Sequence, residues 1–139
     1  MFASSVHAAP TILECTVTGS HTDPNTKRAV SETLEVRVDE IYPDRAITVM
    51  GKEVTFVAYG AHMTGAPPFK IDPEDRSTKD VWDMSSKQTM KDATQKSAIH
   101  INRRTGAISA TNHNQFATGF WTKFAAKGTC VAQSAARKF

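Results

Sequence analysis

The chain has 139 residues, the size of a single domain, and 40% of them are hydrophobic, enough for one core without a structural metal. Its formal net charge is +3, and both signs are spread along the whole sequence, which is not the charge distribution of a nucleic-acid-binding surface. No apolar run approaches the length of a membrane span. The composition therefore predicts one globular domain without a membrane span or a nucleic-acid partner.

The start of the chain resembles the end of a secretory signal peptide. Val6-His7-Ala8 fits the pattern of residues before a cleavage site, but the basic region and the full apolar stretch of a complete signal are missing. The segment is either a trimmed signal peptide or an accidental match. Residues 1–10 are expected to carry no fold information, and a single β-domain is expected over residues 11–139.

Two cysteines flank this predicted domain. Cys15 lies in the first strand-like stretch and Cys130 in the last, and neither belongs to a Cys-x-x-Cys pair, which argues against a zinc or redox motif. A disulfide between them would close most of the chain into one loop, worth about 4–5 kcal/mol in the chain-entropy model. The alternative is two buried free thiols in a cytosolic protein. Together with the signal-like start, the spacing favours the disulfide and a periplasmic or secreted location.

In the first half of the chain, alternating and β-branched residues predict strands. These are expected at residues 11–18, 32–39, 46–50 and 53–59. Residues 19–29 are polar and predict a loop around Asp23-Pro24-Asn25, and residues 42–45 predict a turn that contains Pro43.

In the second half, residues 60–79 hold several glycines and prolines, which excludes a central strand. A connection of this length in a compact domain is usually functional or mobile. Further strands are expected at residues 81–85, 98–102, 107–110 and 116–131. Residues 86–95 predict either a helical turn or a loop, and residues 112–114 predict a turn.

The clearest local pattern is a β-hairpin whose turn ends at Gly106, the residue that can adopt positive φ. With a four-residue loop, Ile101 faces Ile108 and Ile99 faces Ala110. A three-residue loop would instead turn half of the isoleucine face to water. About eight short strands without an amphipathic helix predict an all-β fold, an antiparallel meander that closes into a small barrel or sandwich, its terminal strands linked by the disulfide.

A sparse set of residues along the chain forms a recognisable layout. These residues are Cys15, Ile101-Asn102-Arg103, Thr105-Gly106, Gly128, Cys130 and Arg137-Lys138-Phe139. The layout resembles small exported alphaproteobacterial proteins of unknown function. This resemblance implies a compartment and an architecture, and it implies no activity.

Patterns for catalysis and metal binding are weak. The sequence has no nucleophile elbow and no glycine-rich phosphate loop, and its histidines lack the spacing of a helical zinc pair. A metal site would need His100 and His113 to approach each other with Asp83 as a third ligand, and three solvated polar side chains are the simpler interpretation. We therefore predict no catalytic residue, no metal site and no cofactor.

Aromatic and basic residues supply the candidate binding site. Trp121 has the opposite strand parity to Phe120 and Phe124, so either a bulge near Gly119 buries both sets or one set is exposed. A binding module would expose a tryptophan beside residues 60–79, with basic side chains at the rim. The candidate ligand- or partner-binding residues are Trp82, Trp121, Tyr59, Phe116, Arg103 and Arg104.

These expectations favour a non-enzymatic binding domain of the cell envelope, whose partner is a protein or a small ligand. Two alternatives stay open, an inhibitor of a cell-wall hydrolase and a small envelope hydrolase. Neither the ligand nor the oligomeric state is specified by the sequence.

Overall fold

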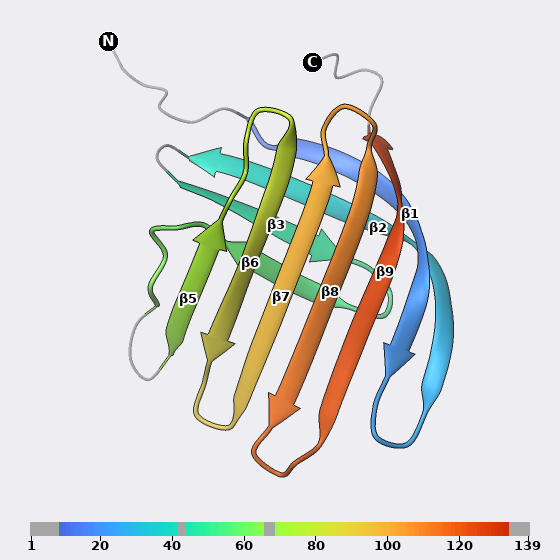
Figure 1. Cartoon of the computed structure of the whole chain (residues 1–139), viewed down its shortest axis with the longest axis vertical. Coiled ribbons are helices and arrows are strands. Elements are labelled where there is room, and N and C mark those ends of the chain that lie inside the picture. The colour runs from blue at the N-terminus through green and yellow to red at the C-terminus, as the bar shows by residue number, and fades with distance from the viewer. Residues whose placement is uncertain (1–8, 42–43, 66–68, 134–139) are drawn as a thin grey trace.

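The computed structural model describes residues 9–41, 44–65 and 69–133. Nine antiparallel strands form one sheet that curls into a nearly closed barrel, with no helix among the described residues (Figure 1). The strands are β1 (Thr11–Thr22), β2 (Lys27–Ile41), β3 (Asp44–Met50), β4 (Thr55–Tyr59), β5 (Lys70–Asp75), β6 (Val81–Thr89), β7 (Ala93–Asn102), β8 (Ala107–Phe116) and β9 (Trp121–Ala132). The predicted all-β antiparallel meander is confirmed, with a barrel rather than a sandwich.

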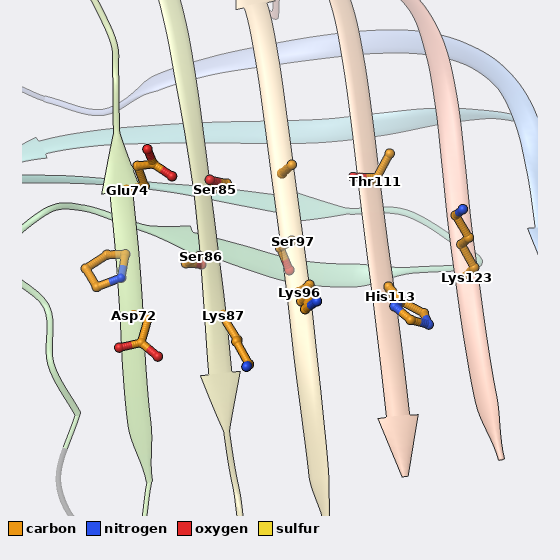
Figure 2. Close-up of a pocket in the computed structure, with 12 residues that line it drawn as sticks. Asp72, Glu74, Ser85, Ser86, Lys87, Lys96, Ser97, Thr111, His113 and Lys123 are labelled. Carbon is orange, nitrogen blue, oxygen red and sulfur yellow. The ribbon is translucent and has the colours of Figure 1, made fainter. Parts of the chain in front are cut away.

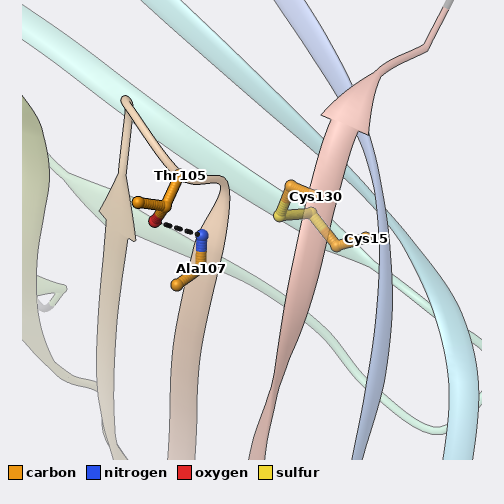
Figure 3. The surroundings of a disulfide bond; sticks show 4 residues. All are labelled: Cys15, Thr105, Ala107 and Cys130. Atoms are coloured by element: carbon orange, nitrogen blue, oxygen red, sulfur yellow. Dashed lines mark hydrogen bonds between the residues drawn. A yellow bond between two sulfur atoms is a disulfide. The ribbon is translucent and has the colours of Figure 1, made fainter.

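The first and last strands lie side by side within the sheet, whose order is β4-β3-β2-β1-β9-β8-β7-β6-β5. Cys15 of β1 stands directly opposite Cys130 of β9, and the two form a disulfide (Figure 3). The predicted link between the terminal strands is therefore confirmed. The backbone N–H of Cys130 also donates to the carbonyl of Gly106 at 2.8 Å, which ties β9 to the turn between β7 and β8.

The two edges of the sheet are β4 and β5, and side chains bridge the seam between them. Arg45 of β3 forms an ion pair with Asp75 of β5 at 3.0 Å. The backbone N–H of Tyr59 on β4 donates to the hydroxyl of Ser86 on β6 at 3.3 Å. These contacts hold the edges together where backbone pairing stops.

The core consists of the inward positions of the alternating strands. On β2, for example, Leu34, Val36 and Val38 are buried, as the alternation in residues 32–39 predicts. The largest fully buried side chains elsewhere include Phe124, Ile47, Met84, Ile99 and Ile101. The interior is thus filled by inward side chains of β6–β9 and of β2 and β3, which cross behind them in Figure 1.

The predicted β7–β8 hairpin has the expected register, with Ile101 opposite Ile108. Gly106 has a φ of +83°, and its N–H donates to the carbonyl of Asn102 at 2.7 Å. The side-chain oxygen of Asn102 accepts the N–H groups of Arg104 and Thr105 at 2.9 and 3.0 Å, respectively. The turn is therefore specified by one glycine and one asparagine. Asparagine side chains often accept hydrogen bonds from the backbone of the turn that they begin.

Several predicted loops are strands instead, which corrects the sequence analysis. The predicted loop 19–29 is shorter, because β1 and β2 continue until Thr22 pairs with Lys27. Residues 86–95, predicted as a helical turn or a loop, mostly belong to strands: 86–89 end β6 and 93–95 begin β7, and only residues 90–92 form a turn. Residues 112–114 lie inside β8, where Asn112 is buried and accepts a hydrogen bond from Ser97 at 3.0 Å. Asparagine, a residue type that favours turns, is tolerated in this strand because another interior side chain hydrogen-bonds its amide group.

Other boundaries also differ from the prediction. Residues 60–79 contain the edge strand β5, in which Pro73 is allowed because one side of an edge strand lacks a backbone partner. The predicted strand 116–131 is interrupted by a turn, with φ of +97° at Gly119, so no bulge is present there. Asp44 and Arg45 begin β3, while residues 42–43, like residues 1–8, lie outside the described residues.

Removing the disulfide should weaken the barrel at the junction of its terminal strands. We expect the double substitution Cys15→Ala/Cys130→Ala to lower the free energy of unfolding by about 3–5 kcal/mol, because the unfolded chain regains the freedom of a very long loop. Urea denaturation measures this change. Wild-type protein whose disulfide has been reduced should approach the stability of the double variant. An unchanged urea midpoint in the double variant would contradict the role of the disulfide.

The turn glycine can be tested against a second glycine with positive φ. A Cβ at Gly106 would collide with the carbonyl oxygen of Cys130, whereas a Cβ at Gly119 would meet no atom within 4 Å. Gly106→Val should therefore cost more than about 1 kcal/mol and more than Gly119→Val, which carries only the backbone strain. Denaturation midpoints of both variants check this, and equal losses would show that the collision is relieved.

Candidate functional site

Three of the predicted binding residues gather at the end of the barrel that carries the β7–β8 turn. Trp82 is 4% exposed, and the Arg103 guanidinium lies over its ring, 4.2 Å from the ring centroid. Both residues and Arg104 line a hollow of about 480 Å³ that reaches Cys130. Cation–π contact of this kind stabilises the turn, so Trp82 is a packing residue covered by Arg103 rather than an exposed tryptophan.

The other predicted residues lie elsewhere. Phe116 and Trp121 are at the opposite end, on either side of the β8–β9 turn, and Tyr59 is on the edge strand β4. Trp121 is partly exposed, but β8, β7 and β6 separate its strand from β5 and the 60–79 segment. The structure therefore does not bring the six predicted residues into one site.

Of the three possible metal ligands, the structure brings two together and leaves the third apart. His100 stands opposite Asp83, with 3.7 Å between the His100 Nδ1 and an Asp83 carboxylate oxygen. His113 lies four residues beyond the partner of His100 on β8, which is about 13 Å along the strand. Within the described part of the chain, no three histidine, cysteine, aspartate or glutamate side chains are placed to hold a metal ion.

A row of three lysines and one histidine crosses the outer face of strands β6 to β9, and sequence reasoning missed it. Lys87 on β6 is opposite Lys96 on β7, Lys96 is opposite His113 on β8, and His113 is opposite Lys123 on β9. We call these four residues the lysine row; Figure 2 shows them on neighbouring strands. The three lysines are exposed and the histidine is half-buried. Four strands at about 4.8 Å spacing place them along a line of about 14 Å.

Beside the lysine row, the sheet surface is hollow. The next register along the strands holds small side chains, namely Ser85, Ala98, Thr111 and Ala125. The hollow has a volume of about 650 Å³ and is lined by the lysine row on one side, by Ser85, Ala98 and Thr111 beneath, and by Asp72 and Glu74 of β5 at one end (Figure 2). A shallow depression thus lies beside a line of positive charge.

The acidic residues nearest to the lysine row are engaged by other cations. Arg76 forms ion pairs with Glu74 at 2.7 Å and with Asp83 at 3.1 Å, and its hydrogen bonds to these two carboxylates raise the pKa of Arg76. Asp72 stands opposite Lys87, but its ion pair at 3.8 Å is with Lys70. Among the described residues, Lys87, Lys96 and Lys123 make no ion pair.

The inner face at the same end of the barrel is polar as well, but its groups satisfy one another. Gln88 donates to Gln95 at 3.2 Å, Gln95 donates to Asn114 at 2.8 Å, and Asn114 donates to Thr122 at 3.2 Å. Such a hydrogen-bonded chain allows amides to face a barrel interior. We interpret it as structural, in contrast to the uncompensated charges outside.

No family model matches the sequence, and no curated protein or solved structure has significant similarity to the chain. None of the described segments is a helix with the length and apolar character needed to cross a membrane. The class that the fold and site define is a disulfide-linked antiparallel β-barrel with a hollow beside a row of lysines on its outer face.

The lysine row should reduce the stability of the free protein. Like charges directly opposite each other on neighbouring strands are unfavourable, and Lys96 stands directly opposite Lys87. Lys96→Gln should therefore raise the free energy of unfolding by about 0.5 kcal/mol at low salt, with a smaller gain as salt screens the charges. Lys127→Gln is the matched control, because Lys127 is exposed on the same face between Ser109 and Thr18. A gain of equal size in both variants would contradict local repulsion.

Proposed function

We propose that this protein is an exported, non-enzymatic binding domain of the cell envelope, and that its partner carries several negative charges. The observation that carries the proposal is the lysine row, whose cations stand side by side while the nearby carboxylates are paired with other residues. An anionic partner would remove the repulsion and supply the missing counter-charges. The row is therefore better explained by binding than by stability.

The shape of the site supports a partner with repeated charges. The hollow is open and shallow, its floor is formed by small side chains, and the cations lie along a line across the strands. A single small anion would engage two adjacent cations, whereas an extended or planar array of charges can engage the whole row. Binding then depends on charge spacing and needs no covalent step.

The disulfide supports the proposed location. A disulfide between Cys15 and Cys130 indicates an oxidising, non-cytoplasmic environment. A periplasmic or secreted location is the finer part of the proposal, and the signal-like residues at the start of the chain support it.

The proposed function can be tested with inorganic polyphosphate, a soluble anion with evenly repeated charges, by isothermal titration calorimetry. Lys87→Gln/Lys96→Gln should weaken binding about tenfold or more, since two of the three lysines of the row are lost. Lys52→Gln/Lys79→Gln is the matched control, because both lysines are exposed, lie outside the row and give the same change in net charge.

Polyphosphate affinity should also fall as salt concentration rises, because counterions screen the row. Equal losses in the two double variants would show that binding depends only on net charge, and would overturn the assignment of the lysine row.

A further inference from the structure

An exposed apolar patch lies at the end of the barrel closest to the lysine row. Met90, Phe116 and Phe120 are 37%, 38% and 42% exposed, and they flank the β6–β7 and β8–β9 turns. The two phenylalanine rings are 6.2 Å apart. We call these three residues the apolar tip; both phenylalanines line a largely apolar hollow of about 570 Å³.

The backbone fixes the position of the apolar tip. The N–H of Ala117 in the β8–β9 turn donates to the carbonyl of Asp92 in the β6–β7 turn at 2.9 Å, so the two turns are joined. Within the β8–β9 turn, the N–H of Phe116 donates to the carbonyl of Phe120 at 2.9 Å. Large apolar side chains are thus held outward on an ordered pair of turns.

Trp121 lies between the apolar tip and the lysine row. It directly follows Phe120 and precedes Lys123 by two residues, so it is on the same outer face as Lys123. Its ring meets the His113 ring edge-on, with 6.3 Å between the centroids. Along β9 the order is therefore apolar tip, tryptophan, then cation, and Lys123 lies three residues or about 10 Å beyond Phe120.

We propose that this end of the barrel docks on an anionic lipid surface, with the apolar tip in the membrane interface and the lysine row against lipid phosphates. The proposal rests on the function proposed for the lysine row and names its partner. Amphipathic surfaces bury their apolar side about 5–10 Å into the boundary between headgroups and acyl chains, tryptophan is enriched at headgroup level, and lysines bind anionic headgroups. The order and spacing along β9 match this arrangement.

The composition of this end favours a lipid surface over a protein partner. The apolar tip has three side chains on two adjacent turns, whereas each partner in a standard protein interface contributes about 20–30 residues. Two signals, apolar insertion and charge, are together sufficient for reversible membrane attachment. Asp92 is the acidic residue that lines the hollow at the tip, and exposed Lys91 precedes it in the same turn.

Vesicle sedimentation tests the proposal with the whole chain. Wild-type protein should sediment with vesicles of phosphatidylglycerol and phosphatidylcholine and remain in solution with phosphatidylcholine alone. Phe116→Ser/Phe120→Ser should reduce binding to the anionic vesicles at least about tenfold and leave polyphosphate binding unchanged. Val131→Ser is the control, because Val131 is an exposed apolar residue beyond Cys130, at the other end of β9. Circular dichroism confirms that each variant is folded.

The outcomes separate the two proposals. Vesicle binding by wild type that the phenylalanine substitutions leave unchanged overturns insertion of the apolar tip, while the lysine row can still bind anions. Polyphosphate binding without any vesicle binding overturns the lipid proposal and assigns the row to a soluble polyanion or an acidic protein surface. Loss of vesicle binding in Lys87→Gln/Lys96→Gln, with a blue shift of the fluorescence of a Trp82→Phe variant, whose one tryptophan is Trp121, on vesicles, supports docking in the proposed orientation.

Discussion

The pairing of β1 with β9 is the constraint on which the rest of the structure depends. These strands approach closely where they meet glycines: a Cβ at Gly19 would collide with the backbone carbonyl of Ala125, and one at Gly128 with that of Thr16. The disulfide holds the same pair of strands in one register. Because the first and last strands are joined inside the sheet, the open seam falls between β4 and β5, where the Arg45–Asp75 ion pair and the hydrogen bond from Tyr59 to Ser86 bridge it.

The same register determines what the two faces of the sheet can do. Inward positions must be apolar or mutually hydrogen-bonded, so they are committed to packing. Outward positions are free of that demand, and on β6 to β9 they place small side chains beside three lysines and a histidine in register. The proposed binding surface therefore leaves the packing of the core unchanged, and the electrostatic repulsion that it introduces is confined to a few exposed side chains.

Local signals in the sequence predicted the parts of the fold that local chemistry specifies. The alternation of residues 32–39 and the Gly106 turn were assigned correctly because each is encoded within about ten neighbouring residues. Residues 86–89, 93–95 and 112–114 were not predicted as strands, since both faces of the sheet are polar there and the apolar period of two disappears. The lysine row could not be predicted for a related reason: its members come from four strands, and only the register of those strands aligns them.

The position of β1 has a consequence for how the chain matures. β1 precedes β9 in the chain, so one side of β1 remains unpaired until β9 arrives more than a hundred residues later. Such long-range pairings form slowly, and the exposed edge of β1 can meanwhile recruit other chains. Oxidation of Cys15 by the wrong partner would fix that error. Efficient production of this barrel should therefore depend on thiol–disulfide exchange more than its small size suggests.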